Sequence, residues 1–170
     1  MRKGIIATNA VVLLLLLGWG LYLLAHSKQK STYVTGRAAQ LAPLEANCSW
    51  IGIDKQHQAN LGLNLEPERA WTDRDQAYLA FKLPAANHPR WLDMDIHAVK
   101  AKRVIVSVDG VASRYKIEGG GKFRLALPAA DGQADQTVLV RFDSQGARPA
   151  SKEDGRWLGI AVGAIRVCSR

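Results

Sequence analysis

The residue types that catalyse reactions or bind metals are present in this sequence, but their spacing matches no catalytic or metal-binding pattern. The four histidines sit in different segments, and none has a second histidine, a cysteine or a carboxylate placed as in a metal site. No serine lies in the Gly-x-Ser-x-Gly sequence that presents a nucleophile. The sequence therefore predicts no enzyme, no metal and no cofactor. A small hydrolase whose catalytic groups are brought together only by the fold is the alternative.

Tryptophans beside charged residues are the second chemical feature. Trp71 lies in AWTDRDQ, and Trp91 lies in HPRWLD, where Asp93 and Asp95 follow. An indole can stack on the C–H face of a sugar ring while nearby carboxylates accept hydrogen bonds from its hydroxyls. Trp71, Trp91, Asp93 and Asp95 are therefore candidate glycan-binding residues. The alternatives are a packing role for the tryptophans and a solvated strand face for the aspartates.

The two cysteines stand far apart, at Cys48 and Cys168. No other residues are spaced to share a metal site with them, so a disulfide that ties together the two ends of the folded region is the simplest interpretation. Such a bond persists in an oxidising compartment, which for a bacterial protein is the periplasm. Two unrelated buried thiols are the alternative.

The segment that precedes this region has the composition of a membrane span. Ile5 to Ala25 reads IIATNAVVLLLLLGWGLYLLA, without a charged residue, and is long enough to cross a hydrocarbon core as a helix. We expect a retained anchor over residues 1–27, a juxtamembrane linker over 28–46 and an exported domain over 47–170. A cleaved signal peptide is the alternative, although its apolar core is usually shorter.

From residue 47 onward the pattern is that of short strands bounded by Pro, Gly, Asp and Asn. Residues 91–99 (WLDMDIHAV) alternate between apolar and polar side chains, as in a sheet with one wet face. The Asp109-Gly110 pair between two apolar runs predicts a tight hairpin. We expect an all-β antiparallel β-sandwich of the jelly-roll type. The expected strands are 48–53, 60–65, 77–83, 91–99, 103–109, 113–118, 122–127, 137–142 and 157–167.

The C-terminal third resembles a known family. Residues 149–160 (PASKEDGRWLGI), followed by AVGAIRV, are similar to the closing pattern of β-sandwich domains appended to bacterial envelope glycosyltransferases and phosphoglycerol transferases. The likeness extends over Leu92 to Val167. Here Asp154 can cap a turn, Arg156 can pair with Asp154 or with a neighbouring strand, and Gly159 permits the close approach of another segment. This chain lacks the multi-spanning catalytic portion, so the resemblance implies a stand-alone accessory domain.

Charge adds to this interpretation. The formal net charge is +8, which favours anionic partners, but the cations are scattered, and nucleic acid is not expected outside the cytosol. We expect a single-pass protein of the bacterial inner membrane with its C-terminal domain in the periplasm. It would support envelope glycan synthesis, modification or export by contacting glycan or a multi-spanning glycosyl or phosphoglycerol transferase. A structural docking subunit without a carbohydrate role is the alternative.

Overall fold

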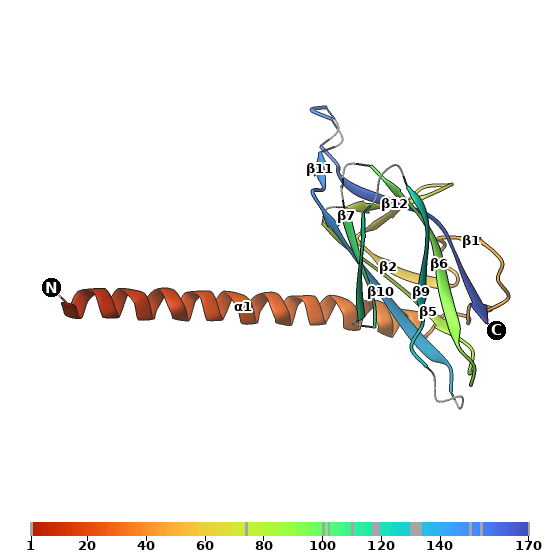
Figure 1. Ribbon diagram of the computed structural model, residues 1–170, viewed down its shortest axis with the longest axis horizontal. Helices are drawn as coiled ribbons and strands as arrows, with labels where there is room; N and C mark the ends of the chain where they lie inside the picture. Colours follow the sequence, from red (N-terminus) through yellow and green to blue (C-terminus); the bar gives the residue numbers. More distant parts are fainter. Residues whose placement is uncertain are drawn as a thin grey trace. The chain divides into compact units, whose positions relative to one another are not determined.

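The computed structural model describes the chain except for residues 1, 74, 100, 102, 110, 117–119, 130–133, 150, 154 and 170. Side chains are also left undescribed at 2–10, 98 and 111–116. The chain divides into two compact units, residues 1–33 and residues 34–170. Figure 1 shows one long helix in the first part of the chain and strands in the rest.

The helix, α1 (Arg2–Ala38), contains the apolar segment. Within the described residues, Val11–Ala38 is the one helical stretch long and apolar enough to cross a membrane, with a mean hydropathy of 1.6. The helix continues through the first part of the segment 28–46 that the sequence analysis assigns to a linker. No proline interrupts residues 26–38, and the first one, Pro43, follows shortly after the helix ends. Ser, Thr and Gly in this segment have low helix propensity, so the burial of Val34 and Ala38 within the second unit is what stabilises the last turns of α1.

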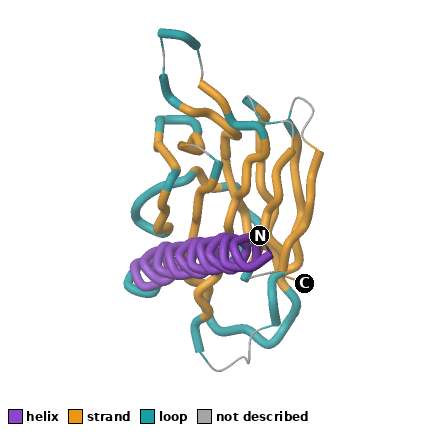
Figure 2. Tube along the Cα trace, turned by 90° about the vertical axis from the view of Figure 1, so that its left-hand side faces the viewer, coloured by secondary structure: helices purple, strands orange, loops and turns teal. Residues whose placement is uncertain are grey.

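The second unit is a sandwich of two antiparallel sheets, which confirms the predicted fold class. Figure 2 shows that strands joined by loops and turns make up most of it. The larger sheet, called sheet A, consists of β1 (Ile51–Gly52), β3 (Leu63–Leu65), β4 (Ala70–Asp73), β6 (Arg90–Ala98), β9 (Gly121–Ala126), β11 (Arg148–Pro149) and β12 (Trp157–Ser169). The other, sheet B, consists of β2 (Gln58–Leu61), β5 (Gln76–Leu83), β7 (Arg103–Val108), β8 (Val111–Lys116) and β10 (Gln136–Gln145).

The strand order is that of a jelly roll. Sheet A runs β3-β4-β12-β6-β9, and sheet B runs β2-β5-β10-β7-β8. The chain alternates between the sheets from β4 to β7 and again from β8 to β11, so that strands distant in sequence become neighbours. The last strand, β12, therefore lies between β4 and β6, and β1 pairs with its C-terminal part.

Alternation along the strands determines which side chains form the core. In β6, Leu92, Met94 and Ile96 are fully buried between the sheets, and the intervening residues point to the outer face of sheet A. β10 shows the same period, with Val140 and Phe142 buried. The outer face of each sheet is thus available for polar side chains.

One part of the outer face of sheet B is covered. Tyr78 and Ala80 of β5 pack with Val34 and Ala38 from the last turns of α1, which belong to the second unit. Because both faces of β5 are buried, its sequence lacks the polar alternation of a half-exposed strand. The outer face of sheet A instead carries the charged and aromatic residues described below.

The hairpin predicted at Asp109 and Gly110 is confirmed by the pairing of Val108 with Val111. Asp109 has a φ of 45°, as a type I′ turn requires. Its carboxylate Oδ1 accepts a hydrogen bond of 2.8 Å from the backbone N of Leu139. Gly110 lies outside the described residues.

Two expected strands differ from those in the structure. The expected strand 48–53 is reduced to β1 because Cys48 has a φ of 64°, which interrupts the extended backbone. The expected strand 60–65 is divided into β2 of sheet B and β3 of sheet A, because Gly62 has a φ of 76° and breaks the extended backbone. The sequence analysis also omits β4 and β11, which are too short for alternation to identify.

Gly159 of β12 lies where other residues approach closely. A Cβ atom there would lie 2.8 Å from Oγ1 of Thr72 on β4 and would collide with the side chain of Ser144 on β10. Oγ1 of Thr72 in turn accepts hydrogen bonds from N of Gly159 (3.1 Å) and N of Ile160 (2.9 Å). Glycine thus allows β12 to be tied to β4 through a buried hydroxyl.

Candidate functional site

The outer face of sheet A brings charged residues from three strands into one line. Asp93 of β6 lies directly opposite Arg166 of β12 on one side and Arg124 of β9 on the other. These strands lie side by side in Figure 1. Directly paired residues of antiparallel strands point to the same face, so the three side chains meet above the sheet.

Asp93 forms a fully engaged ion-pair cluster with the two arginines. Arg124 donates from Nε to Oδ1 at 2.7 Å and from Nη2 to Oδ2 at 2.9 Å, and Arg166 donates from Nε to Oδ2 at 2.9 Å. Asp93 is 4% exposed, whereas the Arg124 side chain is 60% exposed. The Arg124 hydrogen bonds, supported by that of Arg166, hold the pKa of Asp93 below its ordinary value although burial opposes them.

An indole lies at each end of this cluster. The Arg124 guanidinium lies over the Trp91 ring, 5.0 Å from its centroid. The Arg166 guanidinium lies over the Trp50 ring at 4.6 Å. These cation–π contacts extend the cluster to five side chains, which we call the aromatic–ionic row: Trp50, Arg166, Asp93, Arg124 and Trp91.

The disulfide fixes the end of the row that Trp50 forms. Cys48 and Cys168 are bonded, as the sequence predicts, and Cys168 lies opposite Trp91 on the outer face. The backbone N of Cys48 also donates to the carbonyl of Val167 at 3.0 Å. Trp50 follows Cys48 by two residues, so the bond holds its segment against β12.

A second group of polar side chains lies beside the row. Asp95 lies opposite Lys122 in the backbone pairing of β6 with β9, and its Oδ1 lies 3.1 Å from Nε2 of His97. Lys122 extends over the Trp50 ring, with Nζ 5.2 Å from the centroid. A Cβ at Gly163 would lie 3.2 Å from Oδ2 of Asp95, so a glycine gives that carboxylate room.

Trp71 lies elsewhere on the same outer face. It pairs with Ala161, which pairs in turn with His97, six residues from Trp91 along β6. At about 3.3 Å per residue, Trp71 and Trp91 are separated by about 20 Å along the strand direction. They therefore do not form one compact site.

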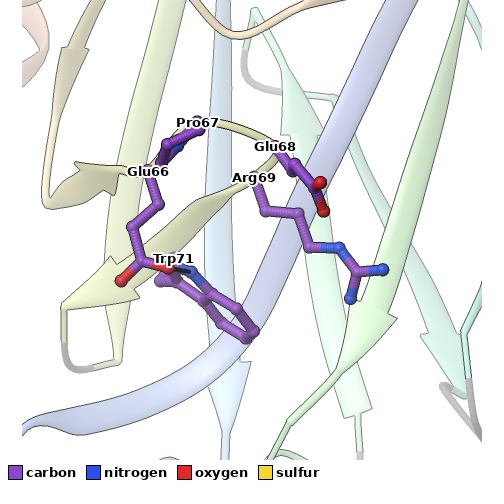
Figure 3. Close-up of a pocket in the computed structure, with 5 residues that line it drawn as sticks. All are labelled: Glu66, Pro67, Glu68, Arg69 and Trp71. Atoms are coloured by element: carbon purple, nitrogen blue, oxygen red, sulfur yellow. Dashed lines mark hydrogen bonds between the residues drawn. The ribbon is translucent and has the colours of Figure 1, made fainter.

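A hollow of about 410 Å³ lies next to Trp71, at the β3–β4 turn. Nε1 of Trp71 donates to Oε2 of Glu66 at 2.6 Å. Figure 3 shows the Glu66 carboxylate next to the Trp71 ring, with Arg69 extending away from both. The polar edge of this indole is thus already satisfied by the protein.

The structure brings together three of the four candidates from the sequence. Trp91, Asp93 and Asp95 share the outward face of β6, and Trp71 is separate. Asp93 is buried beneath its two arginines and accepts hydrogen bonds from both, so it holds them in place on this face.

Sequence reasoning missed Trp50, Arg166, Arg124 and Lys122 as site residues. The alternation of Lys122 and Arg124 with apolar residues in KFRLALP places both cations on a wet face. The sequence pattern therefore shows that both cations face solvent, but it does not show that β9 lies next to β6.

The other candidates from the sequence belong to the C-terminal motif, residues 149–160, and those that the structure describes lie away from the aromatic–ionic row. Nη1 of Arg156 lies 3.3 Å from Oε1 of Glu66, which lies between β3 and β4. Gly159 permits the close contacts described above. Asp154 lies outside the described residues.

The side chains on the outer face of sheet A are of types that can bind a polar ligand. Guanidinium and ammonium groups can donate hydrogen bonds, and indoles can stack. Among the described residues, no group of three or more His, Cys, Asp or Glu side chains could hold a metal ion.

No known protein-family model matches this chain, and no curated protein is similar to it in sequence. Among solved structures, CsCBM6-3 from Clostridium stercorarium in complex with cellobiose is 8% identical, with a TM-score of 0.47 over 76% of this chain and 98% of that one. TmCBM61 in complex with beta-1,4-galactotriose is 10% identical, with a TM-score of 0.42 over 72% and 88%. An acetyl xylan esterase from Butyrivibrio proteoclasticus is 10% identical, with a TM-score of 0.45 over 72% and 32%.

Proposed function

We propose that this chain is a non-catalytic, membrane-anchored protein that binds a glycan on the outer face of sheet A. The observation that carries the proposal is the aromatic–ionic row, in which two indoles and two guanidinium groups are fixed on one exposed sheet face. Rigid strands, ion pairs and a disulfide hold these side chains, so little conformational freedom is lost on binding.

A glycan fits this surface better than a protein partner does. In the described part of the sandwich, Trp157 is the one large hydrophobic side chain that is well exposed, at 44%. A protein-docking face normally presents a contiguous apolar patch, whereas sugars need dispersed polar groups beside aromatic rings. This comparison favours glycan binding over the docking alternative.

The cellular role that we propose follows the resemblance of residues 149–167. Binding would support the synthesis, modification or export of an envelope glycan in the periplasm, next to a multi-spanning glycosyl or phosphoglycerol transferase of the inner membrane. The apolar part of α1 supports anchoring, and the disulfide fits an oxidising compartment.

The proposal predicts that Trp50→Ala weakens glycan binding at least tenfold, because an indole that a ligand covers commonly contributes that much to a binding site. The full chain, in a zwitterionic detergent that carries no sugar, would be screened on an array of envelope polysaccharides. Affinity for each bound glycan would then be measured by calorimetry.

Trp157→Ala is the matched control, since this tryptophan lies nine residues from Arg166 along β12, about 30 Å away. Its affinity should stay within about twofold of the original protein. Equal losses for the two variants, or no binding of any glycan by the folded chain, would contradict the proposal.

A further inference from the structure

We propose that the glycan recognised by sheet A is acidic, and that its carboxylates bind between Lys122 and Arg166 beside Trp50. This inference rests on the proposed glycan binding and names the class of glycan. Three observations carry it. Cations already lie over both indoles, and Asp93 already accepts hydrogen bonds from both arginines. In the described part of the chain, Lys122 has no ion-pair partner.

Cations already lie over both indoles of the aromatic–ionic row. Arg124 lies over Trp91, and Arg166 and Lys122 both lie over Trp50. A neutral sugar would have to displace these groups to stack on the rings. A ligand that approaches this face therefore meets cationic nitrogens before it meets an aromatic surface.

The carboxylates of the face do not neutralise all of these cations. Asp93 accepts three hydrogen bonds from the arginines, and Asp95 is paired with His97. Lys122 forms no ion pair with any residue that the structure describes. Its ammonium group therefore retains its donors for a ligand.

Arg166 retains donors as well. It uses Nε for Asp93, and in the described part of the chain its Nη groups have no acceptor. The two Nη groups of a guanidinium can hold the two oxygens of a carboxylate in a bidentate arrangement. Because Arg166 and Lys122 both lie within about 5 Å of the Trp50 ring centroid, the carboxylates of one bound glycan segment can reach both cations.

Like charges that converge on one ring repel each other, and an anion between them removes that repulsion. A uronic acid fits these requirements because its carboxylate can pair with the same cations that a neutral sugar would have to displace from the rings. The part of the chain that follows the apolar segment of α1 carries a formal net charge of +6, which also attracts such a polymer.

The test uses matched pairs of polysaccharides: galacturonan, glucuronan, mannuronan and hyaluronan, each compared with its carboxyl-reduced counterpart. The full chain in zwitterionic detergent should bind at least one acidic polymer about tenfold more tightly than its reduced form. Equal affinity within every pair would overturn this inference and leave glycan binding in place. No binding to these polymers or to the neutral glycans of the array would reject both proposals.

Variants locate the selectivity. Lys122→Gln should weaken binding of the acidic polymer about tenfold and change binding of its reduced form less than twofold. Arg103→Gln removes the same charge from an exposed position on β7 of the opposite sheet and should change either affinity less than twofold. If Arg103→Gln weakens acidic binding as much as Lys122→Gln, the attraction is one of general charge and the proposed site is wrong.

Discussion

Replacing Cys48 and Cys168 together by alanine is expected to lower the free energy of unfolding of the second unit by about 4 kcal/mol. The bond joins residues separated by 120 positions, and closing so long a loop strongly restricts the unfolded chain. For a unit of this size, the loss corresponds to a fall in melting temperature of about 10 °C. Near-ultraviolet circular dichroism, which reports tryptophan packing, would follow the thermal unfolding of the full chain in micelles.

The reductant supplies the control for the disulfide. Dithiothreitol should lower the melting temperature of the original protein toward that of the double variant, because Cys48 is exposed to solvent. It should leave the variant itself unchanged. An original protein that unfolds at the same temperature with and without reductant would show that the bond does not stabilise the fold.

The second large effect is expected for Asp93→Asn, which should destabilise the sandwich by about 2–3 kcal/mol. The substitution leaves Arg124 and Arg166 without a carboxylate at a buried position. Breaking a fully buried pair costs about 3–5 kcal/mol, and the expected value is lower here because Arg124 is largely exposed. Urea unfolding of the full chain in micelles measures the difference.

The effect of Asp93 depends on pH in a definite direction. The arginines lower the pKa of Asp93 in the folded state below its ordinary value of 3.8. The carboxylate therefore stabilises the fold fully above its unfolded-state pKa, near 4, and this contribution disappears as the pH falls through the lower folded-state pKa. The stability difference between the original protein and Asp93→Asn should be constant above about pH 5 and shrink below about pH 4.

Asp95→Asn is the matched control, two residues along the same strand face. Its carboxylate is about one-third exposed, and His97 is its one charged partner among the residues that the structure describes, so its loss should cost less than about 0.5 kcal/mol. An Asp93→Asn effect as small as that of Asp95→Asn would contradict the structural role given to the ion-pair cluster.

Local patterns made most of the sandwich predictable. The alternation of residues 91–99 correctly predicts a strand with Asp93 and Asp95 on its outer face. The hairpin at Asp109 follows from turn chemistry that acts over two residues. Such signals depend on a single strand or turn and need no knowledge of its neighbours.

The candidate site depends on neighbours that no local pattern identifies. Arg124 is 31 residues from Asp93, and Arg166 is 73 residues away, and the jelly-roll order alone brings them to one line. The role of Trp50 likewise depends on the pairing of β1 with β12. Trp71 could not be separated from Trp91 before the position of β4 was known.

The most direct test of glycan binding by sheet A is hydroxyl-radical footprinting of the full chain with and without a bound glycan, because indoles are readily oxidised and their positions here are distinct. We expect protection of Trp50 and Trp91, with unchanged oxidation of Trp71 and Trp157. Protection of Trp71 alone would move the site to the hollow beside Glu66. Unchanged oxidation of both Trp50 and Trp91 under saturating glycan would contradict the proposed function of the aromatic–ionic row.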